Sequence, residues 1–182
     1  MSLTKLLVPT FTHLLMALSG WLDKATTQLP PADAEALLSA RLAPDMFPLA
    51  TQVRFACVQA QEAMCRLQGL PFPPAITQLL DEGRNAGEHR GSIADAQARI
   101  AETLGLLAKL APDALDIEPD SQVEHELPNG MTFDLTALEY ARDWVLGQFY
   151  FHLMTAYSIL RNQGVALGKA DYVPHMLPYL RS

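Results

Sequence analysis

The sequence is short of charge, of cysteine and of long apolar runs, and each shortage excludes a class of protein. Charged residues make up 18% of its 182 residues, below the ~25% of an average soluble chain, whereas hydrophobic residues make up 49%. This balance excludes a disordered chain, because disordered chains are poor in apolar side chains. The two cysteines, Cys57 and Cys65, offer neither a disulfide framework nor a zinc cluster. We therefore expect a single folded domain over residues 1–182.

Positive charge and membrane signals are also scarce. The formal net charge is −7, which repels phosphate groups and argues against nucleic acid or an anionic membrane surface as a partner. Thr10, His13 and Asp23 interrupt the apolar N-terminal segment before it reaches the ~18 residues of a membrane span. That segment also lacks the basic leader and the small-residue cleavage site of a signal peptide. The expected compartment is the cytoplasm.

Apolar residues recur at helical spacing in four segments, and each segment predicts a long helix. The predicted helices cover Leu3–Gln28, Pro48–Gln68, Ser92–Lys109 and Thr136–Asn162. Ser92 with Asp95, and Thr136 with Glu139, have the spacing of capping boxes at two of the predicted starts. Four long helices around one core predict an all-α four-helix bundle.

The connections between these helices contain weaker signals. Two short strands, Val123–Leu127 and Met131–Leu135, flank an Asn-Gly turn and predict a small β-hairpin before the last helix. Asp33 is expected to cap a short helix that ends at Leu38. A weak helical turn is expected after Pro74, followed by a polar stretch over residues 81–91. Pro9 is expected to bend or restart the first helix, because proline lacks a backbone donor.

His152 is the sharpest candidate for a functional side chain. On a helical wheel it lies in the middle of the apolar stripe of the last helix, so it faces the core. A core-facing imidazole can be a metal ligand or a proton carrier. The plainer interpretation is a neutral core histidine whose ring nitrogens are satisfied by Gln148, Gln59 or a buried water.

The other polar candidates are scattered along the chain. No two histidines have the i, i+3 or i, i+4 spacing of a helical metal motif. His13 lies on the strip of intermediate polarity on the first helix and is a candidate pocket residue. Tyr157, a further candidate, is expected to anchor the C-terminal tail together with Arg161, Lys169 and Asp171.

Four blocks of sequence together resemble the DUF1993 family of uncharacterised proteins. They are LAPDMFPL at 42–49, LPNGMTFD at 127–134, FHLMTAYSILRNQGV at 151–165 and GKADY at 168–172. That family resembles the DinB/YfiT-like clan, whose members are up-down-down-up four-helix bundles. The clan includes metal-dependent enzymes and bacillithiol or mycothiol transferases, so the resemblance implies this fold and raises the question of a metal site.

The residues that would hold such a metal are mostly replaced in this chain. The resemblance implies one histidine on the second long helix and an H-x-x-x-H pair on the last. His152 matches the first member of that pair, but Ala156 occupies the second position. Val58 and Gln59 stand where many relatives carry Asp-His. An amide such as Gln59 is a poor ligand for Zn²⁺ or Ni²⁺, so we expect no tight metal centre and no cofactor.

These observations favour a DinB-like bundle protein that acts as a dimeric binding or scaffold protein with a degenerate metal site. The alternative is a metal-dependent thiol transferase or hydrolase that uses His152 as a zinc or nickel ligand. A third hypothesis makes His152 a metal-free general base in a pocket for a small molecule. The expected homodimer uses the first two helices, where these residues lie outside the main core stripes: Pro9, His13, Met16, Ala17, Gly20, Phe55 and Val58.

Overall fold

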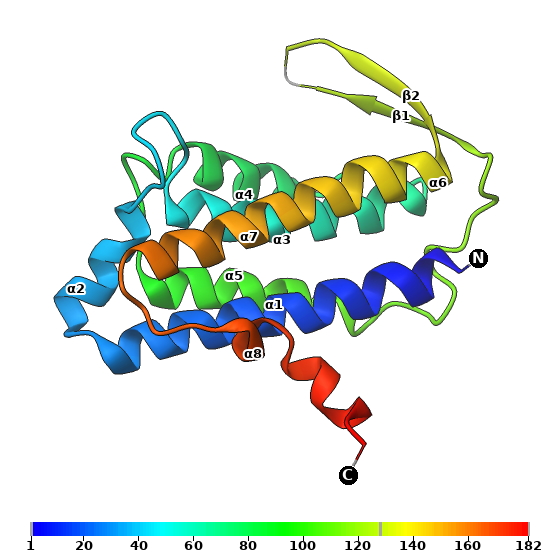
Figure 1. Cartoon of the computed structure of the whole chain (residues 1–182). Coiled ribbons are helices and arrows are strands. Elements are labelled where there is room, and N and C mark those ends of the chain that lie inside the picture. The colour runs from blue at the N-terminus through cyan, green and yellow to red at the C-terminus, as the bar shows by residue number, and fades with distance from the viewer. Residues whose placement is uncertain (1, 128, 182) are drawn as a thin grey trace.

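The computed structural model describes residues 2–127 and 129–181, and its long helices pack around an apolar core (Figure 1). These helices are α1 (Leu3–Gln28), α3 (Leu49–Leu67), α5 (Ile93–Leu107) and α7 (Leu146–Asn162). α1 packs beside α5, and α3 packs beside α7. The mostly helical class with one hairpin in the described part agrees with the prediction. The up-down-down-up order stays a prediction.

α1 begins and ends where its sequence pattern indicates. The Ser2 hydroxyl accepts a hydrogen bond from the Lys5 backbone N–H and caps the helix. The helix then runs through Pro9 without the expected restart. By length and composition α1 could cross a membrane, but its apolar stripe, including Phe11 and Trp21, is buried in the core of the domain. That burial is typical of a core helix.

The segment after Pro73 forms more structure than the expected weak turn. It is an 11-residue helix, α4 (Pro74–Arg84), with Pro74 in its first turn. Ile76, Leu79 and Gly83 are buried on its inner face, so packing against α3 stabilises a helix whose own sequence signal is weak. Before α3, a shorter helix α2 (Pro31–Ala36) and a 3₁₀ turn η1 (Leu37–Ser39) form, with Asp33 in the first turn of α2 and not at its cap.

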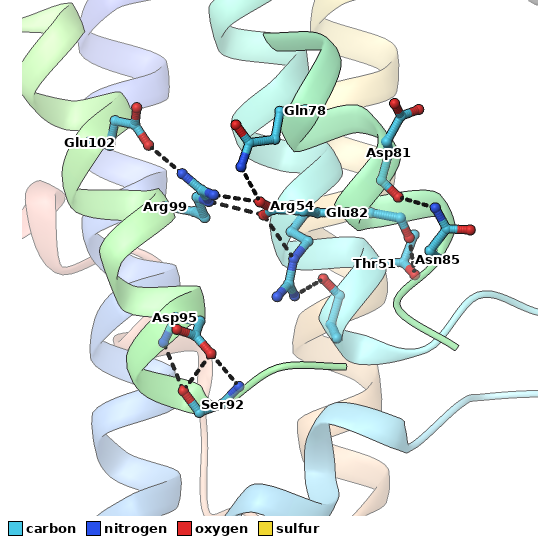
Figure 2. A network of polar contacts seen from close by, with 12 residues as sticks. Thr51, Arg54, Gln78, Asp81, Glu82, Asn85, Ser92, Asp95, Arg99 and Glu102 are labelled. Carbon is cyan, nitrogen blue, oxygen red and sulfur yellow. Dashed lines mark hydrogen bonds and ion pairs between the residues drawn. The ribbon is translucent and has the colours of Figure 1, made fainter. Parts of the chain in front are cut away.

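A polar network holds α4 and α5 against α3 (Figure 2). Glu82 of α4 lies between two arginines: it accepts a 3.0 Å hydrogen bond from Arg99 Nε of α5, and Arg54 Nε of α3 lies 3.8 Å from it. Thr51 donates a 2.8 Å hydrogen bond to the backbone carbonyl of Gly83. These contacts fix one face of α4 and leave its other face to form part of a groove.

α4 also covers residues that the sequence analysis placed on an exposed face. Val58 is 1% exposed and belongs to the core, and Phe55 packs so closely on Gly83 that a Cβ atom there would lie 2.5 Å from the ring. On α1, Ala17 is buried as well. The prediction that these side chains need a second subunit to cover them is therefore wrong for Val58 and Ala17. Their own chain buries them.

The predicted hairpin forms and leads into an irregular helix start. β1 (Gln122–Glu126) pairs antiparallel with β2 (Thr132–Thr136), and His125 lies opposite Phe133. Gly130 has φ = +81°, the conformation for which the Asn-Gly turn was predicted, whereas Pro128 of that turn lies outside the described residues. The last helix was predicted as one continuous α-helix. It instead begins as α6 (Ala137–Glu139) and a π-helical segment η2 (Tyr140–Val145) before α7.

The chain after α7 folds back on α1. Gly164 ends the helix with φ = +87°. The short helix α8 (Lys169–Tyr172) follows, and Asp171 forms a 2.7 Å ion pair with Lys24 of α1. The Trp21 indole donates a 2.8 Å hydrogen bond to the Asp171 backbone carbonyl. The final 3₁₀ segment η3 (Pro174–Tyr179) projects beyond these anchors, at the red end of the chain in Figure 1.

Candidate functional site

His152 faces the core of α7 as predicted, and its hydrogen-bond partner is Gln52 of α3. The side chain is 8% exposed, and its Nδ1 lies 2.9 Å from Gln52 Oε1. The Gln52 amide nitrogen donates to the Phe47 carbonyl, which fixes the orientation of the amide. Because Oε1 can only accept, His152 Nδ1 carries the proton. Burial lowers the pKa of His152 to about 4, so the ring is neutral near pH 7.

Neither of the two expected side-chain partners, Gln148 and Gln59, is the residue bonded to His152 Nδ1. Gln59 lies seven residues beyond Gln52 on α3, which is about 10 Å along the helix axis. Gln148 lies one turn before His152 on the same helix and is half-buried. The side chains that do surround His152 are aromatic: the ring centroids of Phe55 and Phe151 lie 5.2 and 5.3 Å from its own.

Gln59 instead lines a groove of about 460 Å³ between α3, α4, the hairpin and the π-helical segment. Phe72, Ile76 and Leu80 provide an apolar wall along α4 and the loop before it. Polar side chains from four different elements line much of the rest: Gln59, Glu62, Arg66, Arg84, His125 and Trp144. This groove gathers more unpartnered polar groups than the surroundings of His152.

Glu62 is the more buried of the two carboxyl groups that line the groove, the other being the exposed Glu126. It is half-buried on α3, and among the residues that the structure describes it has no hydrogen-bond or ion-pair partner. Burial raises its pKa, an effect that the positive charges of Arg66 and Arg84 partly offset. A partly desolvated carboxylate without a partner is costly, so a donor or a cation beside it would stabilise the site.

His125 and Trp144 lie against each other at the hairpin end of the groove, with ring centroids 4.2 Å apart. His125 is 4% exposed, and neither of its buried ring nitrogens has a hydrogen-bond partner in the described structure. The buried Trp144 Nε1 likewise has none. Burial, and secondarily the charge of Arg66, lower the pKa of His125 to about 4. Buried polar atoms without partners are rare in folded proteins, and a functional site is one of their explanations.

The π-helical segment η2 positions two aromatic residues for this arrangement. Tyr140 opens the segment and Trp144 lies near its end, and both rings lie close to His125, Tyr140 at a centroid distance of 5.7 Å. A π-helical turn contains more residues than an α-helical turn, so it changes the direction in which following side chains point. Such turns are frequent at functional sites.

The remaining predicted site residues lie elsewhere. His13 stacks on His175 with ring centroids 4.8 Å apart and planes 10° apart, beside a separate cavity of about 290 Å³ between α1, α7 and the C-terminal residues. Tyr157 packs edge-on against Trp21 at 5.2 Å and helps to anchor the tail. The five candidates His152, Gln59, Gln148, Tyr157 and His13 thus form no common site in the described structure.

The donors of a metal site do not converge within residues 2–127 and 129–181. No group of three or more His, Cys, Asp or Glu side chains there could hold a metal ion. Cys57 is fully buried and burial raises its pKa to about 12, so its thiol is unreactive near neutral pH. The implied metal site does not fit this chain, because Gln59 and Ala156 stand where the resemblance implies histidines.

Sequence reasoning missed Gln52, Glu62, His125 and Trp144 as site residues. His125 carried a usable signal, because it alternates with Val123 and both are buried on the inner face of β1. Glu62 carried a weaker one, since it falls beside Val58 and Cys65 on a largely apolar helix. The π-helical segment left no pattern that distinguishes it from an α-helix.

Comparisons with known proteins agree with this architecture. A family model described as a domain of unknown function, DUF1993, matches residues 3–173. The crystal structure of a DinB family member protein from Shewanella denitrificans is similar, with a TM-score of 0.74 and 31% sequence identity. The match covers 94% of this chain and 91% of that one. A search of curated proteins gave no match.

Proposed function

Because the chain belongs to the DUF1993 family and has a DinB-like helical fold, we propose that it is a binding protein that holds a small molecule in the groove of α3, α4 and the hairpin. The observation that carries this proposal is that Glu62, which has no hydrogen-bond or ion-pair partner among the described residues, lines the same groove as His125 and Trp144, whose buried ring nitrogens also lack partners there. Ligand sites typically combine an apolar lining with a few convergent polar groups.

The proposed protein works without a DinB-type metal centre. A catalytic zinc needs about three protein ligands, and at the matching positions only His152 is a histidine, while Ala156 and Gln59 stand in place of the other two. With its pKa lowered to about 4, His152 is also a weak general base near pH 7. Its contacts support a structural role that joins α7 to α3 and to the loop at Phe47.

The alternative is a metal-dependent thiol transferase or hydrolase, and one observation favours it. His152 Nε2 has no hydrogen-bond partner in the described structure, so it is available to another ligand. Metal analysis of protein purified without a histidine tag, with a thiol-consumption assay on the same sample, separates the two functions. Stoichiometric zinc or nickel that is lost in His152→Gln would support the enzyme.

The binding function is tested by a thermal-shift panel of small metabolites on three proteins: wild type, Glu62→Gln and the control Glu88→Gln. Glu88 is an exposed residue between α4 and α5, outside the groove. A ligand of the groove should raise the melting temperature of the wild type and of Glu88→Gln and should stabilise Glu62→Gln much less. Equal shifts in all three proteins, or none across the panel, would contradict the proposal.

We also propose that the chain forms a homodimer, with an interface that differs from the expected one. Met16 is 59% exposed on α1, and the stacking of His13 on His175 holds η3 next to it. Leu177 in η3 and Leu180 directly after it add large exposed apolar side chains. α1 and the C-terminal residues are therefore a better candidate surface than α3, whose Val58 is buried by α4.

A further inference from the structure

The groove contains charges of both signs in equal number. Arg66 and Arg84 are positive, Glu62 and Glu126 are negative, and His125 is neutral near pH 7 because its pKa is lowered to about 4. The lining therefore has no net charge. It complements a molecule that also has no net charge better than it complements a polyanion or a polycation.

The negative side of the groove needs a donor. Glu62 has no partner in the described structure, although Arg66 and Arg84 lie near enough for their charges to favour its ionised form. Neither guanidinium is within ion-pair distance of it. A small ammonium group carries three donors and fits between a half-buried carboxylate and the open groove.

The positive side of the groove needs an acceptor. Arg66 uses Nη1 to donate 2.7 Å to the Glu124 carbonyl, but its buried Nε has no partner in the described structure. Arg84 makes only a long contact, 3.5 Å, with the exposed Asp81. A carboxylate accepts hydrogen bonds from guanidinium groups more strongly than a neutral oxygen does.

An apolar surface continues from these charges. Phe72, Ile76 and Leu80 run along one side of the groove, and the last two are one helical turn apart on α4. Arg66 lies over the Phe72 ring at 4.8 Å, so the charged part and the apolar part of the groove adjoin. A ligand that satisfies both parts carries its charged groups close to an apolar substituent.

We propose that the groove binds a free amino acid with a large apolar side chain. Its ammonium group lies at Glu62, its carboxylate at Arg66 and Arg84, and its side chain along Phe72, Ile76 and Leu80. This inference rests on the proposed binding function and specifies its ligand class. The volume of about 460 Å³ holds a molecule of that size.

The two tryptophans of the chain provide a direct test. Trp144 lines the groove, whereas Trp21 is not among the residues that line it, and its indole is bonded to the Asp171 carbonyl. In a ¹H–¹⁵N spectrum, L-phenylalanine should shift the Trp144 indole resonance in a saturable way and leave that of Trp21 in place. Assignment by Trp144→Phe identifies the two signals.

Two analogues and two variants isolate the charged groups. 3-Phenylpropionate lacks the ammonium group and phenethylamine lacks the carboxylate, so each should bind at least tenfold more weakly than L-phenylalanine. Glu62→Gln should weaken L-phenylalanine binding at least tenfold, whereas Glu88→Gln should leave it unchanged. Circular dichroism checks that both variants are folded.

The contrary outcomes separate this inference from the broader function. If either analogue shifts Trp144 as strongly as L-phenylalanine does, the groove binds small molecules but the amino acid class is wrong. If L-phenylalanine leaves the Trp144 resonance in place, or shifts that of Trp21 instead, the inference is also overturned. The binding function then depends only on the wider thermal-shift panel.

Discussion

At the scale of single residues, two buried histidines differ in whether their ring nitrogens are hydrogen-bonded. His152 is bonded to Gln52, whereas His125 has no partner for either ring nitrogen in the described structure. Burial nevertheless lowers the pKa of both to about 4, because in each case the charged ring would lose its hydration. Both are therefore neutral in the folded protein near pH 7, and both must gain a proton when the protein unfolds in acid.

We predict that stability falls as the pH falls from about 6.5 to about 4. Over this range the unfolded chain, with histidine pKa values of ~6.5, binds more protons than the folded one, in which both pKa values are about 4. The loss amounts to roughly 3 kcal/mol per histidine at its greatest. The raised pKa of Glu62 acts in the opposite direction and offsets part of it. Urea titrations at several pH values measure how the free energy of unfolding changes with pH.

The variant His152→Gln measures how much of that pH dependence of stability comes from His152. It should cost about 1–2 kcal/mol at pH 7, because the contact with Gln52 and the aromatic packing are altered. It should also reduce, by about one, the number of protons that the protein takes up when it unfolds in acid, and it should leave metal content unchanged. The matched control is His89→Gln, an exposed histidine, which should change neither quantity. An unchanged slope in His152→Gln would show that its pKa is not lowered.

At the scale of elements, α4 depends on a close approach to α3. A Cβ atom at Gly83 would lie 2.5 Å from Cε1 and 2.7 Å from Cδ1 of Phe55, well inside van der Waals contact. Thr51 also donates to the Gly83 carbonyl, so the backbone there is held in place. The glycine therefore serves packing between two helices, even though glycine is unfavourable in a helix by itself.

We predict opposite effects for the same substitution on two helices. Gly83→Ala should destabilise the protein by about 1–3 kcal/mol, because Phe55 must move and the α3–α4 contact must open. Gly105→Ala on α5 has no heavy atom within 4 Å of the new Cβ and should stabilise by up to ~1 kcal/mol. Chemical denaturation of both variants gives the sign of each change in the free energy of unfolding. A stabilising Gly83→Ala would show that Phe55 moves without cost.

Helices α1 and α4 show where sequence patterns are sufficient to predict an element and where they are not. Leu7, Phe11, Leu18 and Trp21 repeat at helical spacing, and the predicted α1 has the same bounds as the observed one. α4 was predicted only as a weak turn, because its stability comes from docking on α3, which its local sequence does not encode. The π-helical segment η2 was also missed, because its local sequence has no pattern that distinguishes it from an α-helix.

The candidate site was predicted less completely than the fold. The core-facing position of His152 follows from the period of its own helix, but its partner Gln52 is 100 residues away and depends on how two helices align. The groove of Glu62, His125 and Trp144 requires three elements to meet, so a pattern within one element cannot reveal it. The family resemblance directed attention to the metal-site positions, and the unpartnered groups lie elsewhere.

At the scale of the whole molecule, exposed apolar side chains of α1 and of the C-terminal residues form the proposed contact surface. Met16, Met176, Leu177 and Leu180 are each at least half exposed, and the His13–His175 stack keeps α1 and η3 together. Exposed apolar surface of this kind favours association, and closed symmetric dimers are the commonest outcome for a soluble chain. The hairpin and the groove lie on other elements, so a dimer of this kind leaves the groove accessible.

We predict a homodimer of twice the 20.0 kDa chain mass at micromolar concentration. Met16→Glu and Leu177→Glu should each weaken association at least tenfold, because each places a charge in the proposed contact. Leu106→Glu is the matched control, since Leu106 is an exposed apolar residue of α5, outside α1 and η3, and should leave association intact. Multi-angle light scattering over a dilution series measures all four proteins. A wild-type mass of 20.0 kDa throughout that series would refute the dimer, and dissociation by Leu106→Glu alone would move the interface to α5.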